Sequence, residues 1–397
     1  MVSVTEQYDA YPYPERDPAD EARRLIVGSP SHPREIDHWL FAGRRDWTAP
    51  FRALVAGGGT GDGLIQLAQG LASAAVPYEI TYVDLSPAAR RIAEARAAAR
   101  GLSGITFVTG SLLDAPGLGA FDYIDCCGVL HHLPEPEAGF RALRAALAPG
   151  GGMGFMVYAP YGRSGVYPLQ EAFGALFAGL GPEARLARAR DIVAALPEGH
   201  PFRCNPNLGD HEVSDAGFYD LLLHGQDRAY GIDELAGTLA ATGWRLAGFA
   251  TPALYDLARI TERPEGMDDT AAMAVAEKLR GTIRMHVAYA VPGNDARKPA
   301  RATDRALVPH LRGVQPRALA QAVAQGRVLP VTLKEARAEI TLSRGAAPLI
   351  AAIDGRRSLA QIAQVARVDP LAFGGLWAPV ERELVAWGLL LYSGLRG

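Results

Sequence analysis

The residues with the clearest chemical potential are glycines in a short turn. Four glycines lie within five residues directly after the apolar run 54–56: Gly57, Gly58, Gly59 and Gly61. This pattern predicts a buried strand that turns sharply into a helix. Because glycine has no Cβ, a ligand can lie against the backbone there, facing the free N–H groups of the helix. About two dozen residues later, Asp84 ends the next predicted strand, where a carboxylate can accept hydrogen bonds from both hydroxyls of a ribose. Together these features predict a site for an adenosine-containing cofactor.

The spacing of the glycines argues against a nicotinamide dinucleotide as that cofactor. A dinucleotide-binding turn has the pattern G-x-G-x-x-G. Each of the three possible starts, at residues 57–59, places another residue where a glycine is required: Asp62, Thr60 and Leu64, respectively. An NAD(P)-dependent oxidoreductase therefore remains only a less favoured alternative.

Histidines, tyrosines and an arginine follow two later predicted strands, at positions suited to a second substrate. His131 and His132 come directly after the strand at 123–127, and Tyr161 and Arg163 follow the strand at 153–159. Loops at the carboxyl ends of strands line the sites of open α/β sheets. A histidine there can act as a general base or orient a substrate, and an arginine can hold a carboxylate. The plainer alternatives are a polar helix start at the histidines and a packed loop with a solvated arginine.

Composition limits the class of protein. The chain has 397 residues, of which 49% are hydrophobic and 21% charged, and its net charge is −3. These values are typical of a globular protein of about two domains, without a field that favours nucleic acid or an anionic membrane. No apolar run approaches the roughly 18 residues of a membrane span, and the first residues lack the apolar core of a signal peptide. The three cysteines (Cys126, Cys127 and Cys204) suit neither a disulfide framework nor a zinc site. We therefore expect a cytoplasmic protein without a metal.

Strands and helices alternate through the middle of the chain. Strands are predicted at residues 53–56, 79–84, 105–108, 123–127, 153–159, 244–250 and 282–291. Helices are predicted between them at 63–74, 87–99, 135–147 and 231–243. Such alternation predicts an α/β fold with a doubly wound, mostly parallel seven-stranded sheet covered by helices on both faces.

The flanking regions differ from this pattern. Residues 1–50, rich in Tyr, Pro, Arg and His, predict an N-terminal strap or lid. Within the sheet domain at 51–293, residues 160–225 read as an insertion with helices near 169–180 and 183–196. The tail at 303–397 predicts a separate domain that resembles a winged helix, with three short helices at 345–353, 358–366 and 370–387 and a strand at 389–392. Three arginines (Arg356, Arg357 and Arg367) make too thin a basic set to predict DNA binding.

In combination, these motifs resemble those of class I S-adenosylmethionine-dependent methyltransferases over about residues 51–293. The similarity rests on the glycine turn, on Asp84 within Asp-Leu-Ser-Pro, on the segment 121–133, on Leu-Ala-Pro-Gly-Gly at 147–151 and on the late helix at 230–243. The insertion and helical tail resemble bacterial members with an appended regulatory-type domain, some of which act on protein side chains. The resemblance implies S-adenosylmethionine as cofactor and, as cofactor-binding residues, Gly57, Gly58, Gly59, Gly61, Asp62, Asp84, Leu85, Ser111, Leu112, Cys127 and Tyr11.

The chain departs from the family pattern at two positions. Many members carry an acid two residues before the first glycine, where this chain has Val55, and that acid helps to hold the methionine part of the cofactor. Asp62 is the candidate replacement. Many members also read the adenine with an acid at the position of Ser111, whose hydroxyl can still accept a hydrogen bond; Asp114 is the nearby alternative. Tyr11 belongs to an aromatic segment that is expected to fold over the cofactor, where aromatic rings stabilise a sulfonium.

The sequence thus predicts methyl transfer to a nitrogen or oxygen of a small molecule or a protein side chain. Methyl transfer from a sulfonium depends mainly on positioning, so the sequence indicates the cofactor better than the acceptor. A non-catalytic sensor that binds S-adenosylmethionine, with the tail as its output module, is the main alternative. No membrane or nucleic-acid partner is expected, and a homodimer is compatible with the sequence.

Overall fold

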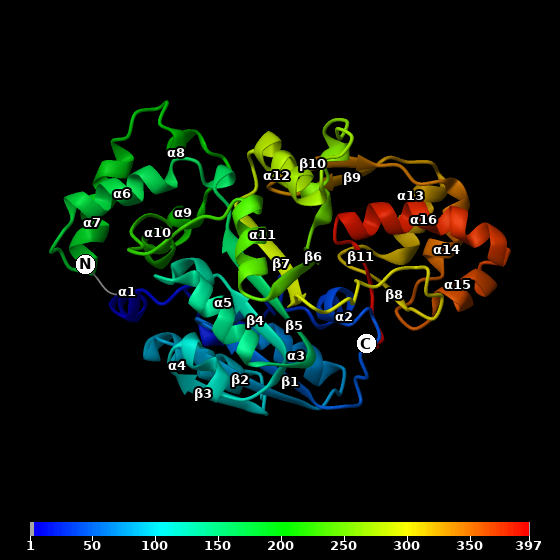
Figure 1. Cartoon of the computed structure of the whole chain (residues 1–397), viewed down its shortest axis with the longest axis horizontal. Coiled ribbons are helices and arrows are strands. Elements are labelled where there is room, and N and C mark those ends of the chain that lie inside the picture. The colour runs from blue at the N-terminus through cyan, green and yellow to red at the C-terminus, as the bar shows by residue number, and fades with distance from the viewer. Residues whose placement is uncertain (1–3, 397) are drawn as a thin grey trace.

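The structure, a computed structural model, describes residues 4–396, and among these a seven-stranded β-sheet is the central element (Figure 1). Its strands follow the order β3-β2-β1-β4-β5-β7-β6. They are β1 (Phe51–Ala56), β2 (Tyr78–Asp84), β3 (Ile105–Thr109), β4 (Phe121–Cys127), β5 (Leu147–Tyr158), β6 (Trp244–Phe249) and β7 (Met285–Pro292). All neighbouring pairs from β3 to β5 are parallel, and β7 is antiparallel to both β5 and β6. The predicted doubly wound, mostly parallel sheet is confirmed.

Helices cover both faces of the sheet and connect its strands. They are α2 (Pro33–Leu40), α3 (Asp62–Ser73), α4 (Pro87–Ala99), α5 (Pro136–Ala145), α11 (Ile232–Ala241) and α12 (Asp269–Arg280). The predicted start of α4 is confirmed, because the Ser86 hydroxyl caps the helix by accepting from the Ala89 N–H at 3.1 Å, with Pro87 as the first helical residue. No helix of the described residues has both the length and the apolar character needed to cross a membrane.

The order of the strands reverses between β1 and β4. Connections from β1 lead through β2 to β3 on one side, and the later strands lie on the other side. At such a switch point the loops diverge and leave a crevice at the carboxyl ends of the strands, where open α/β sheets bind their ligands. The glycine turn after Ala56 and the end of β4 at Cys127 both lie at this point.

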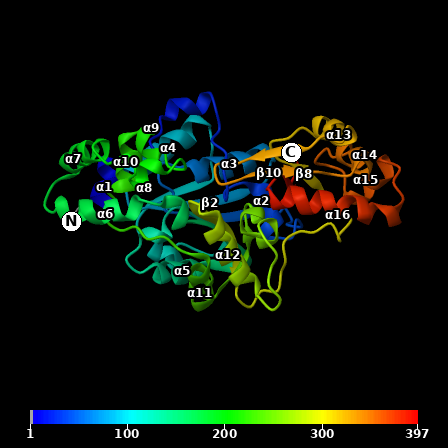
Figure 2. The ribbon, with the colours of Figure 1, turned by 90° about the horizontal axis from the view of Figure 1, so that it is seen from above.

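The segment predicted as an insertion forms a helical subdomain at one end of the molecule (Figures 1 and 2). Its helices are α6 (Val166–Leu176), α7 (Pro182–Ala194), α8 (Pro201–Cys204), α9 (Asp210–Val213) and α10 (Asp215–Leu222). Its own apolar cluster includes Phe173, Phe202 and Phe218. The N-terminal helix α1 (Val4–Ala10) lies against it, and the ring of Tyr11 stacks on that of Tyr219 at 5.1 Å between centroids.

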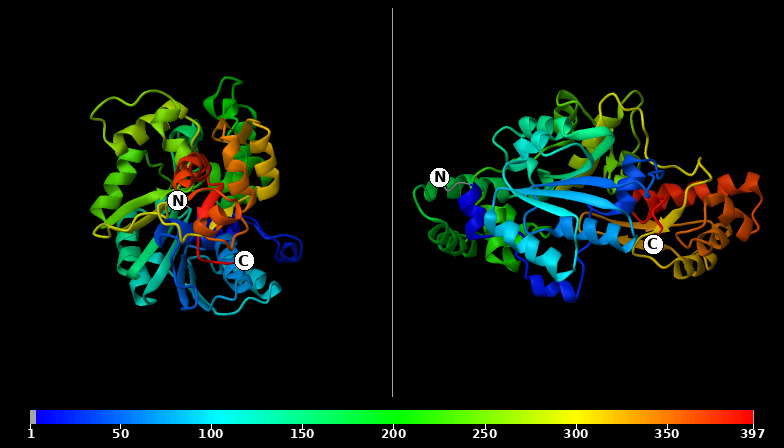
Figure 3. Two further views of the ribbon diagram at one scale, coloured as in Figure 1. Left: turned by 90° about the vertical axis from the view of Figure 1, so that its right-hand side faces the viewer. Right: turned by 90° about the horizontal axis from the view of Figure 1, so that it is seen from below.

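The C-terminal region lies at the opposite end, with the sheet between it and the insertion (Figure 3). Its elements are β8 (Pro309–Leu311), α13 (Pro316–Ala324), β9 (Leu329–Thr332), β10 (Arg337–Ile340), α14 (Ala347–Ala351), α15 (Leu359–Val365), α16 (Pro370–Ala386) and β11 (Leu390–Tyr392). The helices and the strand predicted after residue 345 are present. The helix α13 and the β9–β10 hairpin came without a sequence prediction.

Helix α2 connects these two parts, and the sequence did not predict it. Its seven buried residues include Asp37, whose carboxylate is fully enclosed. Oδ2 accepts hydrogen bonds from the Ser393 hydroxyl at 2.6 Å, the Gly394 N–H at 2.9 Å and the Trp47 indole at 3.1 Å. Oδ1 accepts from the Arg45 N–H at 3.0 Å. The Asp37 carboxylate therefore connects helix α2 both to the residues directly after β11 and to the segment before β1.

We expect Asp37→Ala to lower the free energy of unfolding by about 3 kcal/mol, because it leaves several buried donors without an acceptor. Denaturant unfolding of the full chain measures this change. Asp46→Ala serves as the control, since that carboxylate is exposed and bonds only Thr48 nearby. Its substitution should cost about 1 kcal/mol or less, and equal losses in both variants would contradict the assigned role of Asp37.

Candidate functional site

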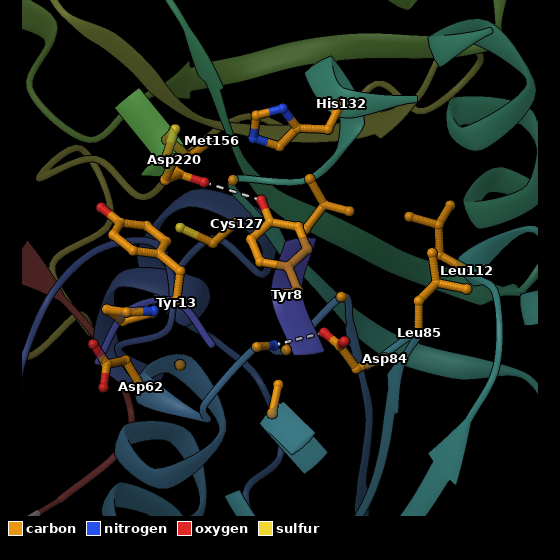
Figure 4. Close-up of a pocket in the computed structure, with 18 of the residues that line it drawn as sticks. Tyr8, Tyr13, Asp62, Asp84, Leu85, Leu112, Cys127, His132, Met156 and Asp220 are labelled. Carbon is orange, nitrogen blue, oxygen red and sulfur yellow. Dashed lines mark hydrogen bonds between the residues drawn. The ribbon is translucent and has the colours of Figure 1, made fainter. Parts of the chain in front are cut away.

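A cavity of about 400 Å³ opens at the switch point of the sheet (Figure 4). Its walls come from the glycine turn, the ends of β2, β4 and β5, the N-terminal segment and the insertion. Figure 4 shows Asp84, Leu85 and Leu112 on one side, and Tyr13, Asp220 and His132 across the space from them. The cavity therefore has two halves, one bounded by the glycine turn and one bounded by polar aromatic side chains.

The glycine turn needs glycine at two positions for different reasons. Gly57 adopts a φ of +69°, and a Cβ there would lie 2.5 Å from a methyl carbon of Val129. A Cβ on Gly58 would overlap the ring of Tyr82, whose hydroxyl donates to the Gly59 carbonyl at 2.5 Å. Glycine at these two positions thus allows the turn to lie close to Val129 and Tyr82 while it also borders the cavity.

Asp84 is already oriented for a ligand at the end of β2. Oδ2 accepts a hydrogen bond from the Gly59 N–H at 2.8 Å, and Oδ1 accepts from the Ser86 N–H at the same distance. Burial raises the pKa of this carboxyl group, and the two backbone bonds oppose that shift. Each oxygen retains lone pairs for a further donor, so the pair of oxygens can accept from two adjacent hydroxyls.

An apolar slot adjoins Asp84. Leu85, Leu112 and Leu133 line it, together with Val83 from β2. The Ser111 hydroxyl lies at its edge but accepts the Leu113 N–H at 3.1 Å, which caps the short helix that follows. The apolar side chains of the slot suit a purine ring, and Ser111 also lines the cavity.

Asp62 also lines the cavity, but its carboxylate is bound by arginines. Arg16 donates to both oxygens, at 2.6 Å in the shortest contact, and Arg96 donates to Oδ1 at 2.7 Å. The pKa of Asp62 is lowered, because these bonds outweigh the effect of burial. Asp62 therefore anchors the N-terminal segment to α3 and α4, and its charge is paired; the role expected for it from the sequence stays a prediction.

The N-terminal segment crosses the cavity. Tyr8, Tyr13 and Pro14 line it, and the Thr60 hydroxyl donates to the Pro14 carbonyl at 2.7 Å. The Ser86 hydroxyl donates to Asp9 Oδ1, also at 2.7 Å. These bonds join the segment to the loops after β1 and β2, so the strap predicted from the sequence lies directly over the glycine turn.

The second half of the cavity is built on a chain of hydrogen bonds. The backbone of Gln226 bonds to two imidazole rings. Its carbonyl accepts a hydrogen bond from His132 Nδ1 at 2.8 Å, so that nitrogen carries a proton. Its N–H donates to His224 Nδ1 at 3.1 Å, so that nitrogen carries none. His224 Nε2 consequently carries a proton and lies 3.2 Å from the Tyr8 hydroxyl, which donates to Asp220 Oδ1 at 3.0 Å. The Tyr158 hydroxyl donates to Asp220 Oδ2 at 3.0 Å.

This arrangement fixes which nitrogen of a neutral His132 ring can accept a hydrogen bond. Because Nδ1 must donate to a carbonyl, the neutral ring has its lone pair on Nε2. His132 lines the cavity, and no residue within 4–396 gives Nε2 a hydrogen bond. The neighbouring His131 is fully buried, which lowers its pKa. Of the two histidines left open by the sequence, His132 alone reaches the cavity.

Arg163 lines the cavity and also supports its wall. Its guanidinium pairs with Asp227 at 3.0 Å, donates to the Tyr167 hydroxyl at 3.1 Å and lies 3.6 Å from the centroid of the Tyr158 ring. These contacts use two of its five N–H donors, and the guanidinium holds the Tyr158 ring in place by a cation–π contact. Arg163 also lines the cavity, so its role in binding a carboxylate stays a prediction.

His132, Asp220 and His224 also lie close enough to be considered as metal ligands, with one atom of each within 4.8 Å of the others. Two histidines and a carboxylate are a known ligand set for divalent metals. In this structure, however, His224 presents a proton on Nε2, and both oxygens of Asp220 accept from tyrosines. The cluster is therefore organised as a hydrogen-bond network, and these bonds would have to be broken for a metal to bind.

The structure brings most of the predicted site residues together and separates four of them. Gly61 begins α3 with a φ of +100° and packs against Ala93. His131 is buried behind the cavity, Tyr161 is 37% exposed on the surface, and Tyr11 packs on the insertion. None of these four side chains or backbone positions lines the cavity, and their expected direct roles stay predictions.

Several residues at the cavity came without a sequence prediction. Asp125 and Asp220, which line it, come from separate elements, as does His224, which lies 3.2 Å from the Tyr8 hydroxyl. Only folding brings them together. Asp125 had a detectable signal, because an acid in an otherwise apolar strand is unusual. Asp220 is likewise an acid within the apolar helix α10. In both cases a buried carboxylate marks the site.

Comparisons with known proteins identify the domain around the glycine turn. Residues 54–153 match a family model described as a methyltransferase domain. An uncharacterised protein of a Synechococcus species is 33% identical over 259 residues, which is 62% of this chain and 60% of that protein. The match therefore spans less than two thirds of that relative.

Solved structures extend the similarity to nearly the whole fold. PKMT2 from Rickettsia typhi superposes with a TM-score of 0.64 at 14% identity, covering 94% of this chain and 78% of that one. PKMT2 in complex with AdoHcy gives a TM-score of 0.62 at 15% identity, covering 92% and 76%. At this identity the likeness concerns the fold, and it includes the insertion and the C-terminal region.

The glycine turn gives a direct test of the geometry. Gly57→Ala combines a strained φ with an overlap against Val129, whereas Gly101→Ala has a similar φ of +64° but no atom within 4 Å of the new Cβ. We expect Gly101→Ala to cost about 1–2 kcal/mol from strain alone, and Gly57→Ala to cost roughly 1–3 kcal/mol more. Denaturant unfolding measures both, and equal costs would show that the turn does not lie against Val129.

Proposed function

We propose that this chain, which carries a methyltransferase domain of the class I fold, transfers the methyl group of S-adenosylmethionine to a nitrogen or oxygen acceptor bound in the second half of the cavity. The observation that carries the proposal is the shared cavity: Asp84 and the glycine turn line one half, and His132, Tyr8, Tyr158 and Asp220 line the other. S-adenosylmethionine is the cofactor that the family model and the fold indicate.

The residues of the first half fit this cofactor. The two oxygens of Asp84 suit the ribose hydroxyls, and the apolar slot of Leu85, Leu112 and Leu133 suits the adenine. The antiparallel β7 next to β5 also distinguishes this sheet from the six-stranded order of dinucleotide-binding folds. These features favour S-adenosylmethionine over a nicotinamide dinucleotide.

In the proposed reaction, the bound cofactor supplies an electrophilic methyl group on a sulfonium. The protein contributes positioning, a closed environment and a proton acceptor. The N-terminal segment covers the glycine turn and excludes water. His132 Nε2, held by the bond from Nδ1 to Gln226, takes the proton that a hydroxyl or ammonium acceptor must lose. Asp220 and its tyrosine partners form the polar wall that orients this acceptor.

The second half of the cavity supports an enzyme rather than a sensor. A protein that only senses the cofactor needs no space beyond it, whereas here the cavity continues to Tyr158 and Arg163, which belong to the end of β5 and the loop after it. The polar groups in this half are held by bonds to other protein groups, as expected for a prepared acceptor site.

Calorimetry with S-adenosylmethionine and its demethylated product S-adenosylhomocysteine tests the cofactor. We expect both to bind, and Asp84→Ala to weaken binding by about 1.5–3 kcal/mol through loss of charge-assisted hydrogen bonds, a roughly ten- to hundred-fold change in Kd. Glu79→Ala, on an exposed acid of the same strand that does not line the cavity, is the matched control and should bind both ligands as the wild type does. Absence of binding to the wild-type protein at high micromolar concentration would refute the proposed cofactor.

Labelled S-adenosylmethionine tests for catalysis and the role of His132. Incubation with cell extract, followed by separation into protein and small-molecule fractions, should show where the methyl group goes. With that acceptor, His132→Gln should lower kcat roughly 10²- to 10⁴-fold, as for loss of a general base, without weakening S-adenosylhomocysteine. His131→Gln, the same change on a ring outside the cavity, should reduce kcat far less. A larger loss in His131→Gln would reverse the assignment.

A further inference from the structure

An ionisable carboxylate lies deep in the first half of the cavity with no role in the account above. Asp125 is on β4, only 2% exposed, and lines the cavity. In the sheet register it lies directly opposite Val55 on β1. Val55 is the position where the resembling methyltransferases carry the acid that helps to hold the methionine part of the cofactor. The carboxylate missing from β1 therefore has a counterpart on the adjacent strand.

The surroundings of Asp125 leave one of its oxygens available. The Ser31 hydroxyl donates to Oδ2 at 2.5 Å, and the Tyr123 hydroxyl, whose proton has its shorter bond to the Pro30 carbonyl at 3.0 Å, lies 3.3 Å from the same oxygen. Within residues 4–396, no hydrogen bond reaches Oδ1, and no arginine or lysine pairs with this carboxylate. Since a buried carboxylate without a cation is costly, the free oxygen indicates a position for a cationic ligand group.

The fold places this oxygen at the correct end of the cofactor site. Asp84 fixes the ribose at the end of β2, and the apolar slot takes the adenine beside β3. The remaining part of the cofactor must then extend the other way, over β1 towards β4 and the start of α3. Gly63, in the first turn of α3, leaves room there: a Cβ on it would lie 3.5 Å from Asp125 Oδ1 and 2.7 Å from the Ser31 hydroxyl.

We propose that Asp125, oriented by Ser31, binds the α-ammonium group of the methionine part of S-adenosylmethionine. This inference rests on the proposed cofactor and assigns a ligand to a residue that the family pattern does not use. Ser31 is itself held in place, because the preceding Pro30 carbonyl accepts from the hydroxyls of Tyr123 at 3.0 Å and Tyr289 at 3.2 Å. The segment before α2 thereby becomes part of the cofactor site.

Asp62, the acid that the sequence favoured for this task, is the competing candidate. Its two oxygens already accept from Arg16 and Arg96, which neutralise it. Asp125 has hydroxyl partners only, so its charge is not compensated within the described residues. The comparison favours Asp125 as the group that meets the ammonium and Asp62 as a structural anchor.

Binding measurements with matched ligands test the proposal. The ligands are S-adenosylhomocysteine, its analogue with hydrogen in place of the amino group, and 5′-methylthioadenosine, which lacks the whole amino-acid part. Asp125→Asn should weaken S-adenosylhomocysteine at least ten-fold and leave the other two within about two-fold. The wild-type protein should prefer S-adenosylhomocysteine to the deaminated analogue, and Asp125→Asn should lose that preference.

Two further variants keep the test decisive. Asp122→Asn makes the same change on the same strand. The Asp122 carboxylate pairs with Arg45 and Arg52 and does not line the cavity, so this variant should bind all three ligands as the wild type does.

Ser31→Ala keeps the charge of Asp125 but removes the bond that orients it. It should weaken S-adenosylhomocysteine by less than Asp125→Asn does, without affecting 5′-methylthioadenosine, and it provides the test if Asp125→Asn does not fold.

The pH dependence of binding gives a second readout. Burial raises the pKa of Asp125 to about 6. The groups that face it do not titrate there: the pKa values of Tyr123, Tyr289 and Cys127 are all raised, and Asp62 stays ionised through its arginine partners. Below pH 6 the carboxyl group of the free protein gains a proton and cannot pair with an ammonium. The affinity of the wild type for S-adenosylhomocysteine should therefore fall by about ten-fold more than that of Asp125→Asn between pH 7 and pH 5.

The outcomes separate this inference from the proposed function. Equal weakening of S-adenosylhomocysteine and 5′-methylthioadenosine by Asp125→Asn would show that Asp125 only supports the fold, and unchanged binding of S-adenosylhomocysteine would show that another group meets the ammonium. Either result overturns the proposal while the cofactor stands. Failure of the wild type to bind S-adenosylhomocysteine would overturn the proposed cofactor itself, and this inference with it.

Discussion

The parallel pairing of β1 with β2 and β4 is the constraint on which the site depends. Because the three strands run in the same direction and in fixed register, their carboxyl ends meet at one edge of the sheet. Asp84 then lies beside the glycine turn, close enough to accept the Gly59 N–H, and Asp125 lies level with Val55. A register shift of one residue in β4 would turn Asp125 to the other face of the sheet. The two carboxylates thus occupy the cavity because of the pairing, and not through any local motif.

The second half of the cavity depends on contacts between distant parts of the chain. Tyr8 from the N-terminal helix and Asp220 from the insertion share a hydrogen bond across 212 residues of sequence. Gln226, just after the insertion, fixes both His132 and His224 through its backbone. The sheet therefore supplies the half of the cavity that we propose for the cofactor, and the elements added around it supply most of the half that we propose for the acceptor. This division is consistent with a general cofactor site combined with a particular acceptor.

The sequence predicted the parts of the molecule that local patterns determine. The strands, the helices of the sheet domain and the residues of the glycine turn follow from apolar periodicity and from backbone demands that glycine meets. It did not predict α2, whose residues Glu35, Asp37 and His38 are polar and yet buried by contacts with distant segments. For the same reason it named Asp62 as the candidate and gave Asp125 no role: Asp62 is near the glycines in sequence, whereas Asp125 is near them only through strand pairing. Arg16 and Arg96, which neutralise Asp62, are likewise distant in sequence.

The central claim is that one cavity holds S-adenosylmethionine between Asp84 and Asp125 and leaves its other half for the acceptor. A crystal structure of the full chain with S-adenosylhomocysteine tests this most directly. The account predicts the ribose hydroxyls within hydrogen-bond distance of the Asp84 oxygens, the amino group on Asp125 Oδ1, and the sulfur facing the space beside Tyr8 and His132. A cofactor product bound with its ribose away from Asp84, or with its amino-acid part away from β4, would contradict it.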